Sequence, residues 1–93
     1  MASDTADVII ARLNSACRCD GIETRICERS TRLWVNLPGN RAHMAEFVSL
    51  RPDVDDQLCF FWLIGGKSIK ICPASEIALA VESIRQVLSV SIF

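Results

Sequence analysis

Seven apolar residues in a row, from Leu58 to Ile64, lead directly into the pair Gly65-Gly66. These bulky aromatic and aliphatic residues favour a pleated strand. Two glycines between apolar runs predict a tight hairpin, because two-residue turns need the positive φ that glycine adopts without steric cost. The strand is apolar on both of its faces, so we expect both to be covered. Its pattern leaves open which residues face outward, since a slip of one residue exchanges the two sets.

The strand that returns after the turn alternates regularly. Ile69 and Ile71 share one face, while Ser68 and Lys70 share the other. Pro73 then ends the strand, because proline has no N–H to donate to a neighbouring strand and suits the first turn of a helix.

A helix is expected to close the chain. Ser75 is suited to the N-cap position, and Glu76 then lies close to the positive end of the helix. Apolar residues recur at helical spacing and form one stripe, made of Ile77, Ala80, Val81, Ile84, Val87 and Leu88.

The chain also begins with a predicted helix, capped by Ser3 or Asp4 and ended by Asp20-Gly21. Its apolar stripe consists of Ile9, Ile10, Leu13, Ala16 and Cys17.

Three strands are expected between this helix and the apolar run. The first spans Ile22 to Glu28, with Ile22 and Ile26 facing in. The second spans Arg32 to Leu37, with Leu33, Val35 and Leu37 on one face and Trp34 on the other.

The third expected strand starts at about Ala45 and ends at Leu50. The alternative is a single helical turn capped by Asn40 and running to Met44. A polar, acidic loop then runs from Arg51 to Gln57. Short links favour an α+β fold in which an antiparallel sheet of four to five strands carries the N- and C-terminal helices on one face.

Length and charge narrow the class of protein. A chain of 93 residues forms one domain, residues 1–93. Ten Lys and Arg balance eleven Asp and Glu, so no overall field attracts nucleic acid or an anionic membrane. Asp4 and Asp7 stand where a signal peptide carries basic residues, and the five cysteines are an odd number. We therefore expect a cytoplasmic protein with reduced thiols and no membrane association.

The last third of the chain resembles a group of small, functionally uncharacterised actinobacterial proteins. The resemblance rests on the aromatic strand Phe60-Phe61-Trp62, the glycine turn, Pro73-Ala74 and a closing helix with Ile77, Ala80, Ile84 and Val87-Leu88. It implies an α+β fold and a bacterial cytoplasm, and it implies no activity.

No arrangement of residues indicates catalysis or a cofactor. Cys17, Cys19 and Cys27 offer three thiols, but structural zinc sites pair cysteines at other spacings, and His43 is the only histidine. A nucleophilic site would have that single histidine as its possible imidazole base. We predict a protein that is not an enzyme and binds no metal or cofactor.

The second face of the sheet is the strongest functional indication. Two helices cover one face, so Trp34, Phe47 and one parity of the apolar run point the other way, and uncovered apolar patches usually mark an interface. The alternative is a strongly curled sheet with scattered exposed aromatics. We predict a protein–protein interaction module, a homodimer or an adaptor of a larger protein. Its predicted anchors are Trp34, Phe47, Phe60 and Trp62.

A second hypothesis is a platform for single-stranded nucleic acid, on which aromatic side chains stack bases and basic side chains hold the backbone. The basic residues concerned are Arg25, Arg29, Arg32, Arg41, Lys67 and Lys70. The near-neutral net charge makes this the weaker hypothesis.

Overall fold

The structure, a computed structural model, describes residues 6–27, 31–36, 46–64 and 66–90. The elements are α1 (Ala6–Cys19), β1 (Glu23–Cys27), β2 (Arg32–Asn36), β3 (Glu46–Pro52), β4 (Leu58–Ile64), β5 (Lys67–Pro73) and α2 (Ile77–Val90). The predicted order of a helix, about five strands and a second helix is confirmed.

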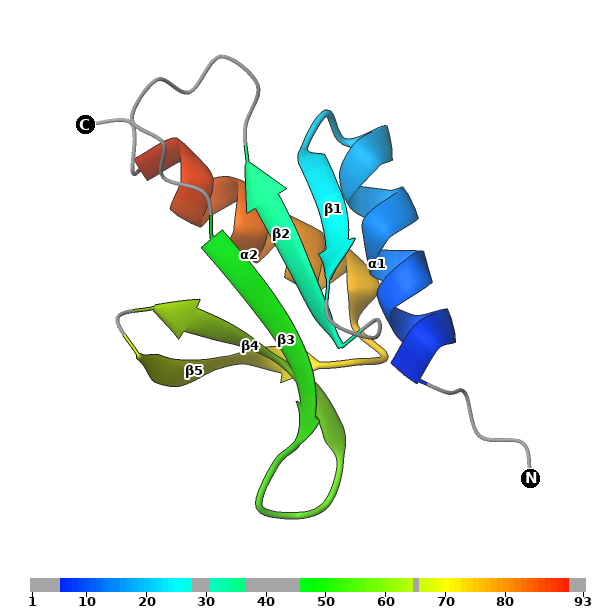
Figure 1. Cartoon of the computed structure of the whole chain (residues 1–93), viewed down its shortest axis with the longest axis vertical. Helices are drawn as coiled ribbons and strands as arrows, with labels where there is room; N and C mark the ends of the chain where they lie inside the picture. Colours follow the sequence, from blue (N-terminus) through cyan, green and yellow to red (C-terminus); the bar gives the residue numbers. More distant parts are fainter. Residues whose placement is uncertain (1–5, 28–30, 37–45, 65, 91–93) are drawn as a thin grey trace.

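The five strands form one antiparallel meander in the order β1-β2-β3-β4-β5. Figure 1 shows α1 beside β1 and α2 behind β2, while the strands turn progressively from β1 to β5. Residues of both helices and of strands β2 to β5, together with Ile22 directly before β1, belong to, or pack against, one apolar cluster. The predicted α+β fold, with both helices on one face of the sheet, is therefore confirmed.

The helix ends follow the local sequence. Gly21 has a φ of 81°, and the Ile22 N–H donates to the Cys17 carbonyl at 2.9 Å, which closes α1 as predicted. The predicted caps Ser3 and Asp4 lie outside the described residues. The Ala80 N–H donates to the Glu76 carbonyl, so Glu76 is the N-cap residue of α2. The predicted N-cap was Ser75, so the helix begins one residue later than predicted, at Ile77.

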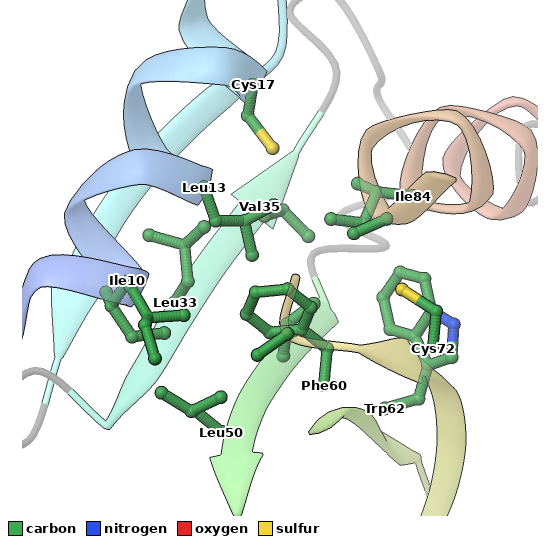
Figure 2. Close-up of a cluster of buried hydrophobic side chains, with 14 of the residues drawn as sticks. Ile10, Leu13, Cys17, Leu33, Val35, Leu50, Phe60, Trp62, Cys72 and Ile84 are labelled. Carbon is green, nitrogen blue, oxygen red and sulfur yellow. The ribbon is translucent and has the colours of Figure 1, made fainter. Parts of the chain in front are cut away.

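Pairing with β3 sets the parity of β4. Trp62 pairs with Val48 and Phe60 with Leu50, and residues directly opposite each other share a face. Phe60 is 0% exposed and Trp62 5% exposed, and both point into the core between the sheet and the helices (Figure 2). The prediction that they anchor a surface interface is therefore wrong, because these two aromatics fill the core of their own chain.

An irregularity in β5 changes which side chains reach the core. Phe60 pairs with Cys72 but Phe61 pairs with Lys70, so Ile71 is an extra residue in the ladder. Cys72 therefore lies in the core next to Phe60, whereas Ile69, which pairs with Trp62, is half exposed. Ile69 and Ile71 lie on the same side of the sheet as predicted, Ile69 opposite Trp62 and Ile71 packed against the core cluster, and the bulge adds Cys72 to that side.

The exposure of one side chain and the position of one strand end differ from the predictions. The Ile26 side chain pairs with Leu33 on the core face as predicted, but it is 41% exposed. Arg51 and Pro52 extend β3 instead of starting the loop, which leaves residues 53–57 to join β3 to β4. The start of β3 at Glu46 agrees with the prediction, while the alternative turn from Asn40 to Met44 lies outside the described residues.

Within the described ranges, neither helix is long and apolar enough to cross a lipid bilayer.

Candidate functional site

The sheet face opposite the helices, which we call the open face, carries the candidate site. Strand pairing assigns to it Glu23, Arg25 and Cys27 of β1, Arg32, Trp34 and Asn36 of β2, Phe47, Ser49 and Arg51 of β3, Cys59, Phe61 and Leu63 of β4, and Ser68, Lys70 and Pro73 of β5. In the part of the chain that the structure describes, no helix or strand packs on this face.

One row of the open face is apolar at its centre. Trp34 pairs with Phe47, and Phe47 pairs with Leu63, so three large apolar side chains lie next to one another across β2, β3 and β4. Phe47 is 38% exposed, and Trp34 and Leu63 are half-buried. The row is therefore accessible to a partner.

Arginines lie against the aromatic rings. The guanidinium of Arg25 lies over Trp34, 5.5 Å from the ring centroid, and that of Arg51 lies over Phe61 at 5.0 Å. Arg51 also donates a hydrogen bond to the Ser68 hydroxyl at 3.1 Å. Stacking of this kind is worth roughly 0.5–1 kcal/mol at exposed sites, and it orders side chains that would otherwise be mobile.

Ser49 lies at the centre of the next row, between Arg32 and Phe61. It is 5% exposed, and its hydroxyl has no hydrogen-bond partner among the described residues. A hollow of about 230 Å³ borders it, with Arg32, Arg51 and Leu63 in its wall. Buried polar groups are normally paired, so this hydroxyl keeps an unused hydrogen-bonding capacity at the edge of the hollow.

A second cluster of polar groups ties the β3–β4 loop to β5. The Lys70 ammonium donates to the Asp53 carboxylate at 3.0 Å, and the backbone N–H groups of Gln57 and Asp55 donate to the same carboxylate at 3.0 and 2.8 Å. The hydrogen bond from Lys70, followed by the one from Gln57, lowers the pKa of Asp53 to about 2. The same bond raises the pKa of Lys70. The pair is therefore charged at neutral pH and holds the loop in place.

The thiol of Cys59 lies beside this pair, with its sulfur 3.6 Å from Asp53 Oδ2. Burial raises the pKa of Cys59, so the thiol stays protonated and is a poor nucleophile. Burial likewise raises the pKa of Cys17 to about 12. Neither cysteine is an activated thiol of the kind that covalent catalysis uses.

The three cysteines of the predicted thiol cluster differ in exposure. Cys17 is buried in the core, Cys19 is exposed on α1 and Cys27 is partly exposed on the open face. Within the described residues, no group of three or more His, Cys, Asp and Glu side chains is placed to hold a metal ion. His43 lies outside these residues.

The structure brings together only part of each predicted site. Of the four predicted anchors, Trp34 and Phe47 lie side by side on the open face, whereas Phe60 and Trp62 are in the core. Of the basic residues predicted for nucleic-acid binding, Arg25, Arg32 and Lys70 lie on the open face. Lys67 pairs with Ile64 and has the opposite parity. Arg29 and Arg41 lie outside the described residues.

Sequence reasoning missed Ser49, Arg51, Phe61 and Leu63, which the structure places on the open face. One signal was present. Val48 and Leu50 are the apolar positions of β3, so Ser49 between them must face outward. The position of the loop, residues 53–57, then sets which residues of β4 pair with β3 and turns Phe61 and Leu63 outward.

No family model, no curated protein and no solved structure matches the chain. The likeness to small actinobacterial proteins therefore stays a prediction from the sequence.

Proposed function

We propose that this protein is a non-enzymatic interaction module that binds another protein molecule, a second copy or a larger partner, through its open face. The observation that carries the proposal is the cross-strand row of Trp34, Phe47 and Leu63 on the side of the sheet that the helices leave uncovered. Large aromatics and arginine are the residue types that dominate binding energy at the centres of protein interfaces.

The arginines support a protein partner over a nucleic acid. Arg25 and Arg51 lie over the rings of Trp34 and Phe61, so each guanidinium occupies a ring face on which a base would have to stack. The net charge of −1 also gives little general attraction to a phosphate backbone.

A single-stranded nucleic-acid platform remains the second candidate, favoured by one observation. Arg25, Arg32 and Lys70 lie on the same face as the exposed aromatics. The experiment below separates the two candidates.

We place this activity in the cytoplasm. All five cysteines are unpaired, which supports a reducing compartment because disulfides form in oxidising ones.

Site-specific photocrosslinking tests the proposal. A photoreactive phenylalanine analogue replaces Phe47 on the open face or, as the matched control, Leu79, which is 47% exposed on α2. After irradiation of cells that make the protein, we expect a discrete adduct from position 47 that resists nuclease, is digested by protease and is missing from position 79. Absence of that adduct would contradict the proposal, and an adduct that nuclease removes would establish the nucleic-acid candidate instead.

Substitution provides the quantitative counterpart once an adduct has been identified. Phe47→Ala should cost about 2 kcal/mol of association free energy if Phe47 is an anchor. Leu79→Ala should leave association unchanged, and circular dichroism checks that both variants are folded.

A further inference from the structure

The β3–β4 loop, residues 53–57, is opposite in charge to the open face. Val54 at its tip is 100% exposed, and Asp55 and Asp56 beside it are exposed. The carboxylates of Asp55 and Asp56 make no hydrogen bond or ion pair within the described part of the chain. The loop thus presents one apolar side chain next to two carboxylates that make no hydrogen bond or ion pair with the described residues, and Lys70 is the positive charge near Asp55.

The loop is also held in one conformation. The Asp53 N–H donates to the Gln57 carbonyl at 2.9 Å, and the Asp56 N–H donates to the Asp53 carbonyl at 3.0 Å. The ion pair between Asp53 and Lys70 fastens the base of the loop to β5. A loop that is already ordered loses little conformational entropy when it docks.

The hollow beside Ser49 has the complementary chemistry. Arg32 and Arg51 lie in its wall, and the buried Ser49 hydroxyl has no acceptor among the described residues. Arginine and hydroxyl donors together suit a carboxylate. Leu63 supplies an apolar wall for a neighbouring aliphatic side chain.

We propose, resting on the function proposed above, that two copies of this chain form a symmetric dimer in which each inserts its loop, residues 53–57, into the hollow beside the other's Ser49. A two-fold axis relates the two contacts, so the acidic loop of each protomer meets Arg32 and Arg51 of its partner. The contact is closed by symmetry, so it produces dimers and not filaments.

Charge favours this arrangement over packing one open face flat against the other. A flat face-to-face dimer would set two faces of the same sign against each other with no acidic loop between them, and like charges in an interface are unfavourable. Insertion of the loop sets carboxylates against the arginines of the open face instead.

Pairing through the edge strand β1 is also disfavoured. The guanidinium of Arg18 donates to the Thr24 carbonyl at 3.2 Å and to the Thr24 hydroxyl at 2.9 Å. A partner strand would have to displace this side chain, because it occupies a backbone acceptor that a new ladder needs.

Charge reversal tests the dimer. The face variant carries Arg32→Glu and Arg51→Glu, and the loop variant carries Val54→Lys and Asp55→Lys. Asp56 is left unchanged because its φ is 64°, which lysine adopts poorly. Sedimentation equilibrium should show a dimer for the wild-type chain and at least tenfold weaker self-association for each variant alone.

Mixing the two variants is the decisive step. In a mixed dimer, both contacts pair a glutamate with a lysine or an aspartate with an arginine, so an equimolar mixture should recover dimers of mixed mass in native mass spectrometry. Glu82→Lys, an exposed charge reversal on α2, should leave the dimer unchanged. The loop variant changes only exposed side chains, so it remains informative if the face variant fails to fold.

A wild-type chain that stays monomeric, variants that dimerise as well as wild type, or a mixture that stays monomeric would each overturn the loop-exchange dimer. These outcomes leave the broader proposal intact if position 47 crosslinks to a different protein. Absence of any protein adduct at position 47 would instead remove the proposed function itself.

Discussion

Two buried hydroxyls occupy contrasting environments in this small sheet. Thr24 and Ser49 are each 5% exposed. The Thr24 hydroxyl accepts a hydrogen bond from Arg18 at 2.9 Å and donates one to the Asn14 side chain, whereas the Ser49 hydroxyl has no partner among the described residues. Thr24 therefore contributes to folding, and Ser49 retains its hydrogen-bonding capacity for another molecule.

This contrast predicts different effects on stability. Thr24→Val should lower the free energy of unfolding by about 1–2 kcal/mol, because Arg18 and Asn14 lose a shared partner. Ser49→Ala should change it by less than about 0.5 kcal/mol, because no hydrogen bond is lost. Urea denaturation of dilute, monomeric protein at neutral pH measures both. A loss of stability in Ser49→Ala equal to that in Thr24→Val would show that the Ser49 hydroxyl is paired within its own chain.

At the level of single elements, the inward face could be predicted where apolar residues recur at a regular spacing, and it could not be predicted where every residue is apolar. The stripes of α1 and α2 follow a helical period, and Leu33 and Val35 alternate in β2, so each of these elements fixes its own inward face. β4 is apolar on both faces, so its parity depends on the pairing of Trp62 with Val48. That long-range register is what the sequence pattern of β4 lacks.

The residues of the candidate site could likewise be predicted only in part. The outward direction of Trp34 and Phe47 was predictable from the sequence. Leu33 and Val35 face the core on either side of Trp34, so alternation turns Trp34 outward. Val48 faces the core next to Phe47 and in the same way turns Phe47 outward. The outward direction of Phe61 and Leu63 was not predictable, because it follows from the parity of β4. The bulge at Ile71 left no local signal either, since Lys67 to Cys72 reads as a regular strand.

The parity of β4 has a direct optical test, because the two tryptophans lie on opposite faces. Trp34→Phe leaves Trp62, which is 5% exposed, so its emission should be blue-shifted and weakly quenched by acrylamide. Trp62→Phe leaves the half-buried Trp34, whose emission should be red-shifted and more strongly quenched. Equal quenching of the two variants would mean that β4 has the other parity.

For the whole molecule, the number of layers determines which face of the sheet stays uncovered. Two helices and five strands make two layers around one core, and the residues that the structure describes supply no third layer for the open face. If the proposed association through that face covers its apolar row, the stability of the fold and its assembly should be linked.

This linkage predicts that the thermal midpoint rises with protein concentration. Above the dissociation constant of the dimer, each tenfold increase should raise the midpoint by about 3–5 °C, because only the folded chain associates. The loop variant with Val54→Lys and Asp55→Lys should give a midpoint that does not change with concentration. A wild-type midpoint that is equally constant would show that folding and self-association are independent.

The placement of both helices on one side of the sheet also has a practical consequence. α1 begins at Ala6 and α2 ends at Val90, and both lie on the side away from the open face (Figure 1). A fusion partner or a surface tether joined through either helix would therefore leave the binding side directed toward solution. In the proposed dimer the two cargoes would be carried on opposite outer surfaces, so the module would act as a spacer that joins two attached proteins back to back.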